Sequence, residues 1–139
     1  MSRDLFLYLH ILVGLALILL PIMIIFQTQE KKSKWIKPLS FITALISWIL
    51  LIPSGNLYVK FYPATKTLIK AGSRPWVHSI IMETKEHWGL LLPMIATVAA
   101  GLVFSNKIKE SRKWWVLLMV LSILMGIMGW IITNAGVVR

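Results

Sequence analysis

Four long stretches of this chain carry no charged side chain, and this pattern restricts the fold more than any other feature of the sequence. The stretches are Leu5–Gln29, Pro38–Val59, Trp88–Asn106 and Trp114–Val138. Each is close to or above the ~20 residues that an α-helix needs to cross ~30 Å of hydrocarbon. The charged residues gather between the stretches, and 58% of all residues are hydrophobic. The sequence therefore predicts four transmembrane helices rather than a soluble domain.

The predicted fold is all-α, an integral membrane bundle of four transmembrane helices that forms a single domain over residues 1–139. The expected helices cover approximately residues 5–27, 38–54, 76–105 and 113–135. Because short links join helices one to two and three to four, each pair should form an antiparallel hairpin. Residues 55–75 combine aromatic and basic side chains, which suits a segment at the level of the lipid headgroups. Helix one is too long for a cleavable signal peptide, so it should be retained.

The charged residues between the helices predict the orientation. Two short loops are dense in positive charge, and the positive-inside rule places such loops in the cytoplasm. These loops contain Glu30, Lys31, Lys32, Lys34 and Lys37, and Lys107, Lys109, Glu110, Arg112 and Lys113. We therefore expect a multi-pass protein of the cell membrane with both termini outside.

The composition also excludes several kinds of chemistry and partner. The formal net charge is +10, but the basic residues flank membrane spans, where they anchor to headgroups of the lipid bilayer. The charge therefore predicts no nucleic-acid partner. The chain has no cysteine, which excludes thiol–disulfide exchange, iron–sulfur clusters and thiolate ligation of haem.

The three histidines, His10, His78 and His87, should lie toward the same membrane surface. Helix three enters the membrane from the side on which helix one begins, so this follows from the helix count alone. His10 should lie ~7–8 Å and His87 ~15 Å along their helices, which is compatible with one shared ligand plane. His78 lies nine positions before His87 and should face the opposite side of the same helix. One histidine pair is plausible, with His78 as an alternative to His87.

The neighbours of His10 and His87 suit a flat, bulky cofactor. Gly14, one turn below His10, leaves room for such a ligand or for another helix. Glu83, one turn above His87, is positioned to accept a hydrogen bond from its ring, as in many metal-ligating histidines. Lys85 lies on the same side and can pair with a propionate. One hypothesis is therefore a haem b between helices one and three, with His10 and His87 as axial iron ligands.

The stretch "LYLHILVGLALILLP", residues Leu7 to Pro21, resembles the first helix of small four-helix haem-binding membrane proteins. This group includes the copper-resistance-D-like and protoporphyrinogen-oxidase-J-like families and small di-haem cytochromes b. The resemblance covers mainly helix one and the helix count, about a third of the chain. It implies that His10 is a haem ligand and, by position, that His87 is its partner. The Trp-x-Gly signature that often follows the first histidine is absent, as is a second histidine pair, which argues against two haems.

Two function classes follow. In the first, the chain is a membrane b-type cytochrome or haem-bearing subunit, an oxidoreductase-type protein that passes electrons between quinol and an outer-side partner. That partner would be an acidic redox protein or a larger membrane complex. In the second, the chain is a cofactor-free structural or assembly subunit, and Glu83, Lys85 and Glu86 are a solvated helix start with carboxylates at the favourable end of the dipole. Further alternatives are a proton relay through Glu86 or His87 and a metal site at the surface.

Overall fold

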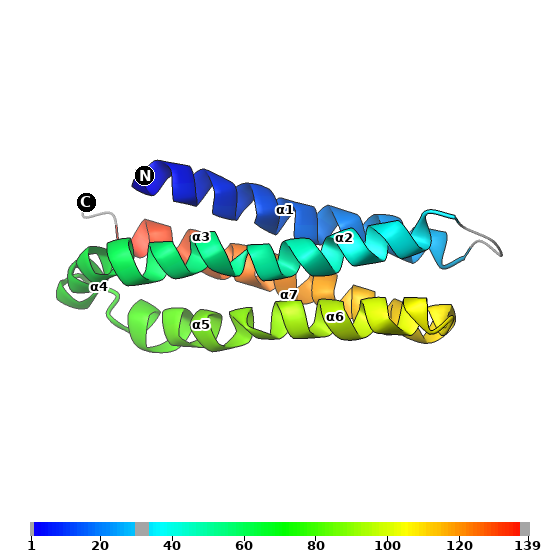
Figure 1. Cartoon of the computed structure of the whole chain (residues 1–139). Helices are drawn as coiled ribbons and strands as arrows, with labels where there is room; N and C mark the ends of the chain where they lie inside the picture. The colour runs from blue at the N-terminus through cyan, green and yellow to red at the C-terminus, as the bar shows by residue number, and fades with distance from the viewer. Residues whose placement is uncertain (1, 30–33, 137–139) are drawn as a thin grey trace.

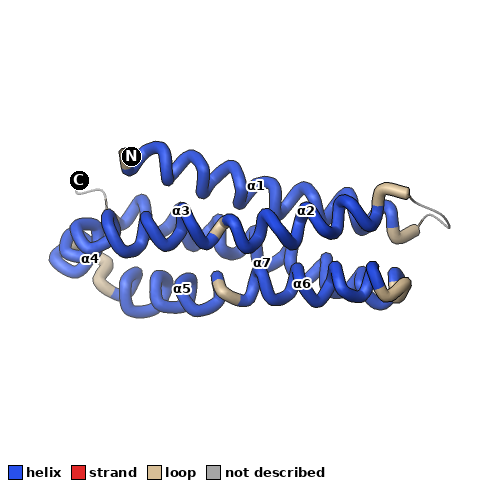
Figure 2. The backbone as a smooth tube through the Cα atoms, viewed as in Figure 1, coloured by secondary structure: helices blue, strands red, loops and turns tan. Residues whose placement is uncertain are grey.

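The computed structural model describes residues 2–29 and 34–136, and it is built from helices (Figure 1). In chain order the elements are α1 (Arg3–Gln27), α2 (Ile36–Ile49), α3 (Leu51–Asn56), the π-helix η1 (Leu57–Phe61), α4 (Tyr62–Ala71), the π-helix η2 (Val77–Met82), α5 (Glu83–Gly89), α6 (Leu91–Phe104) and α7 (Ile108–Ala135). Breaks at Leu50 and Leu90 interrupt the second and third long helical rods (Figure 2).

Within the described residues, four helical segments are long and apolar enough to cross a membrane: Arg3–Gln27, Ile36–Ala71, Val77–Phe104 and Ile108–Ala135. The predicted four-helix membrane fold is thereby confirmed, and the chain is a multi-pass membrane protein. α1 packs against α2 and α7, and α6 packs against the same two helices. α1 and α6 are therefore diagonal partners. α1 begins and α7 ends at the same end of the bundle (Figure 1), which we call the amino-terminal end.

Small side chains fill much of the interior, and they allow the helices to approach one another closely. In lipid, this close packing takes the place of the hydrophobic effect in holding helices together. On α2, Ser40, Thr43 and Ser47 are fully buried, and on α6 Ala96 and Ala99 are as well. The hydroxyls of Thr43 and Ser47 bond to carbonyls of their own helix, those of Leu39 and Ala44. Large aliphatic and aromatic side chains instead cover the outer faces. This pattern is expected when the surrounding solvent is lipid.

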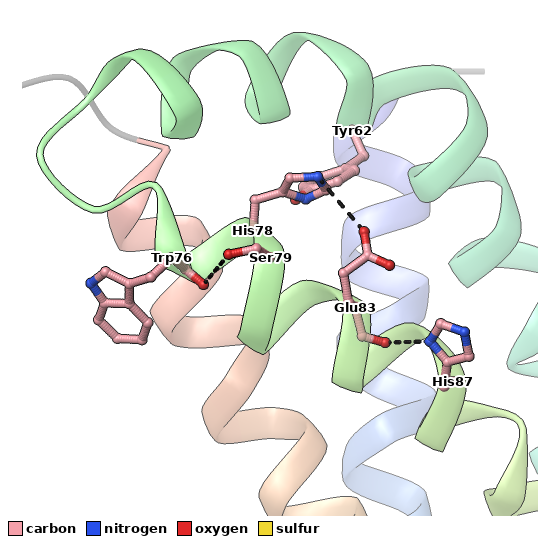
Figure 3. Close-up of polar contacts among 6 residues, drawn as sticks. All are labelled: Tyr62, Trp76, His78, Ser79, Glu83 and His87. Atoms are coloured by element: carbon pink, nitrogen blue, oxygen red, sulfur yellow. Dashed lines mark hydrogen bonds and ion pairs between the residues drawn. The ribbon is translucent and has the colours of Figure 1, made fainter.

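The second span runs farther than the sequence pattern predicts. We expected it to stop near Pro53, but helical structure continues through α3, η1 and α4 to Ala71, so most of the predicted interfacial segment 55–75 is helical. Pro53 lies in the first turn of α3, where a missing N–H costs little. Ser54 and Asn56 bond through their side chains to the carbonyls of Leu50 and Ile52. α4 turns across the amino-terminal end of the bundle (Figure 3).

The fourth helix begins at Ile108 rather than near residue 113. The preceding turn is tight, since Asn106 adopts a left-handed φ of 59°, a conformation that asparagine tolerates better than most residues. Consequently Lys109, Glu110, Arg112 and Lys113 belong to the first turns of α7. In the other predicted cytoplasmic loop, Glu30, Lys31 and Lys32 lie outside the described residues.

Candidate functional site

His10 presents one free ring nitrogen inside the amino-terminal half of the bundle. Its Nδ1 lies 2.9 Å from Oγ of Ser54 on α3. The single hydroxyl proton of Ser54 is donated to the carbonyl of Leu50 at 2.7 Å. Ser54 can therefore only accept from His10, so Nδ1 of His10 carries the proton and Nε2 has a free lone pair. This is the tautomer that a ligating imidazole needs, with its second nitrogen anchored by a hydrogen bond.

Space is open beside Gly14, one turn below His10. No atom of a neighbouring element lies within 4 Å of the position that a Cβ on Gly14 would occupy. The glycine is thus not there to admit another helix, which was one of the two roles expected from the sequence. An imidazole with a free nitrogen above an open strip of helix fits one face of a flat ligand.

Lys85 is the cation that the structure brings to His10. Its charge acts on the His10 ring, and its Cε lies 3.5 Å from the position of a Cβ on Gly129 of α7. Gly129 therefore leaves room for the aliphatic stem of Lys85 to pass toward the bundle interior. Among the described residues, Lys85 has no carboxylate within ion-pair distance. The site consequently offers an uncompensated positive charge to an anionic group.

His87 lies on a different face of α5. Its Nδ1 donates to the backbone carbonyl of Glu83 at 2.6 Å, and its side chain is exposed. The bond leaves Nε2 free, as in His10. However, Lys85 and His87 are two residues apart, which separates them by about 200° around the helix axis. Because Lys85 is directed toward α7 and His10, His87 points away from them. The axial pairing of His10 and His87 remains a prediction, and this structure does not bring the two rings together.

His78 is engaged at both ring nitrogens. Nδ1 lies 2.9 Å from the Tyr62 hydroxyl, and Nε2 lies 3.7 Å from Oε1 of Glu83. The side chain is buried, with 5% of its surface exposed. Figure 3 shows the imidazole between the phenol and the carboxylate. Nε2 lies beyond hydrogen-bond distance of the carboxylate, so its contact with Glu83 is electrostatic, whereas Nδ1 is within hydrogen-bond distance of the Tyr62 hydroxyl. In this arrangement Nδ1 of His78 is occupied by Tyr62, and Nε2 faces Glu83.

Sequence reasoning missed three residues that organise the site: Ser54, Tyr58 and Tyr62. Tyr58 stacks on Tyr62 with ring centroids 5.6 Å apart and lies close to the carboxylate of Glu86. The three follow one another at intervals of four, so on a helix they share a face. That spacing was the available signal, but it was obscured because we expected the helix to end at Pro53.

The donor set fits a porphyrin better than a bare metal ion. A tightly held bare ion generally takes three or four ligands from the protein, and no group of three or more His, Asp or Glu side chains suited to a metal occurs within residues 2–29 and 34–136. A porphyrin already supplies four nitrogens to its iron, so one or two imidazoles suffice. His10 meets this requirement on one side of the ring.

No protein-family model, curated protein or solved structure matches this chain.

Proposed function

We propose that this chain is a membrane electron-transfer subunit of the cytochrome b kind, which binds haem b through His10 and passes electrons from quinol to an outer-side partner. The observation that carries the proposal is the hydrogen bond between His10 and Ser54. Ser54 holds the Nδ1–H of His10, so Nε2 is free inside a membrane span, beside the open space at Gly14. Polar groups inside membrane spans are costly and generally have a functional reason.

The residues of the site would each have a defined task. His10 would hold the iron from one side, and Ser54 would fix the orientation of the imidazole and increase its basicity. Lys85 would pair with a propionate and, through its charge, favour the reduced form. The bound haem would supply one-electron chemistry. His87 would serve as the second ligand only after α5 turns, and the π-helix η2 directly before it is the kind of irregular segment that is frequent at functional sites.

An absorption spectrum of the purified protein tests the proposal. Protein made in haem-replete membranes should show a Soret band and a reducible α-band. His10→Ala should abolish both, whereas Glu110→Gln, at the other end of the bundle, should leave them unchanged. His87→Ala decides the coordination: a change from a six-coordinate low-spin to a high-spin spectrum would identify His87 as the second ligand. A colourless, folded wild-type preparation would contradict the proposal and favour a cofactor-free structural or assembly subunit.

A further inference from the structure

The second and third spans break at the same depth. From the breaks at Leu50 and Leu90, α2 and α6 extend to the other end of the bundle; they contain 14 residues each and pack against one another. The two breaks therefore lie at one level (Figure 2). Pro53 and Pro93 each follow a break by three residues. Because proline has no N–H, it removes one bond of the helix and allows bending there. The two spans thus carry a pair of hinges.

Beyond these hinges the second and third spans separate. α3 packs against α1, α5 packs against α7, and α1 packs against α7, so three of the four walls around the amino-terminal half are packed helix pairs. Within the described residues, α3 and α5 do not form such a pair, and their backbones run apart (Figure 1). Side chains span this fourth wall, since Tyr58 of η1 lies close to the Glu86 carboxylate of α5. We call the wall the α3–α5 seam, and Tyr58 and Glu86 its bridge.

The amino-terminal end of this half is covered. α4 lies across it (Figure 3), and the buried Tyr62 and Ile69 of α4 belong to one hydrophobic cluster. The other buried members of the cluster are Val77 of η2 and Ile132 of α7. A molecule in the water beyond this end therefore meets packed side chains, whereas a molecule dissolved in the bilayer reaches the seam directly.

We propose that the α3–α5 seam is a lateral entrance, through which a flat amphiphile with a carboxylate passes from the bilayer to His10 and Lys85. The inference deepens the proposed function and rests on it for the identity of the amphiphile, a porphyrin. Gly14 lies one turn from His10, and Gly89 lies one turn from Lys85. Among the described residues, no atom of a neighbouring element lies within 4 Å of the Cβ position of either glycine. The inner side of the seam therefore leaves room beside both polar groups.

Both helices of the seam have irregular backbone at each end. α3 contains 6 residues, between the break at Leu50 and the π-helix η1, and α5 contains 7, between the π-helix η2 and the break at Leu90. On the other side of the breaks, Nε1 of Trp48 donates to Oγ1 of Thr97 at 3.0 Å and holds α2 to α6. α3 and α5 can therefore bow apart between two fixed regions, the α2–α6 pair and the cluster under α4, once the bridge opens.

Reversible cross-linking of the bridge tests the entrance directly. The chain has no cysteine, so Tyr58→Cys combined with Glu86→Cys introduces a single thiol pair, which a short, reducible bis-methanethiosulfonate reagent joins. Fluorescence then measures the binding of metal-free protoporphyrin IX to the full-length apoprotein in lipid nanodiscs, and this readout requires neither iron nor electron transfer. The cross-linked protein should bind at least about tenfold more slowly than the same protein after reduction with dithiothreitol, because the closed seam blocks the route.

The matched control joins two helices that stay packed when the seam opens. Trp48→Cys combined with Thr97→Cys places one thiol on α2 and one on α6, where the two side chains are in contact. After treatment with the same reagent, the association rate should stay within about twofold of the rate for the reduced protein. An equal loss of rate in both cysteine pairs, or no loss in the seam pair, would overturn the lateral entrance.

Replacement of the two prolines tests the hinges without any reagent. Pro53→Ala and Pro93→Ala together supply N–H groups that can bond to the carbonyls of Ile49 and Gly89, four residues earlier. The stiffened spans should bind protoporphyrin IX about three- to tenfold more slowly than the wild type. Pro21→Ala makes the same replacement inside α1, away from the seam, and should not change the rate. An unchanged rate in the double variant, with helical circular dichroism showing that it is folded, would overturn the hinges.

The two proposals fail in different ways. A haem spectrum, together with a porphyrin association rate that the seam cross-link does not change, would overturn the lateral entrance alone. Porphyrin binding that the cross-link slows, in a protein that stays colourless in haem-replete membranes, would support the entrance and overturn only the proposed function. Protoporphyrin IX that does not bind at all would overturn the entrance, whatever the haem spectrum shows.

Discussion

Lys85 of α5 packs its Cε 3.5 Å from where a Cβ on Gly129 of α7 would lie. This contact decides which side chain faces His10, because it directs the lysine inward and leaves His87 on the outer face of the same helix. An alanine at Gly129 would make an ordinary van der Waals contact with the lysine stem, but a larger side chain would displace it.

Gly129→Leu should therefore move Lys85 and perturb the haem site. We expect a shifted Soret maximum and a lower midpoint potential, measured by redox titration. Gly126→Leu is the matched control on the same helix, since no atom of another element lies within 4 Å of its Cβ position. Equal spectra for both leucine variants would show that Lys85 does not act on the site.

Removal of the Lys85 charge should itself change the redox potential. Lys85→Met keeps an unbranched apolar stem against Gly129 but removes the ammonium group. Because a nearby positive charge favours the reduced haem, the midpoint potential should fall on the order of tens of millivolts. Lys113→Met, whose exposed side chain lies in the first turns of α7 at the opposite end, should leave the potential unchanged.

The hydrogen bond between Ser54 and His10 should control haem affinity. Ser54→Ala removes the acceptor of Nδ1–H, so haem affinity should fall by about 10- to 100-fold, as for other partners of ligating histidines. Ser54→Thr keeps a hydroxyl and should retain most of the affinity. Haem titration of apoprotein measures both. Ser40→Ala, at a buried serine without a hydrogen-bond partner, provides a control for hydroxyl loss, and a comparable fall there would contradict the prediction.

The contact between α2 and α6 should be stabilised by an indole hydrogen bond. Nε1 of Trp48 donates to Oγ1 of Thr97 at 3.0 Å on the outer surface of the bundle. Trp48→Phe should lower the free energy of unfolding by about 0.6 kcal/mol beyond the loss of packing, the usual scale for such bonds within membranes. A double-mutant cycle with Thr97→Val, measured by unfolding in mixed micelles, isolates this coupling. A coupling energy of zero would count against the bond.

The carboxyl end of α7 approaches α4 too closely for a side chain. A Cβ on Gly136 would lie 2.7 Å from Cγ2 of Thr65, and the branched threonine has little freedom to move. Gly136→Ala should destabilise the protein by about 1–3 kcal/mol through overpacking. Thr65→Ala removes the methyl group, so the double variant should recover most of the lost stability in the same unfolding assay. Failure of this rescue would place the strain elsewhere.

The sequence predicted the approximate lengths of the helices but not their rotation about their own axes. Runs without charge predicted the four spans, because hydrocarbon thickness sets the length of an apolar helix. The count of spans then placed the beginning of α1 and of η2 at one end of the bundle, and with them His10 and His78. There were two exceptions in length. In the second span, Pro53 at a first helical turn was misinterpreted as a stop, and the fourth helix begins at Ile108 instead of near residue 113.

Only the tertiary structure decided what faces His10. Hydropathy is nearly uniform around these helices, so it carries little information on their rotation. The rotation depends on packing contacts such as Lys85 against Gly129, and on η1 and η2, whose π-helical turns shift the faces of the residues that follow. Ser54, the partner of His10, and Tyr62, the partner of His78, likewise come from a segment that continued as helix past Pro53. The residue types at this end were apparent in the sequence, but their pairing required the packed bundle.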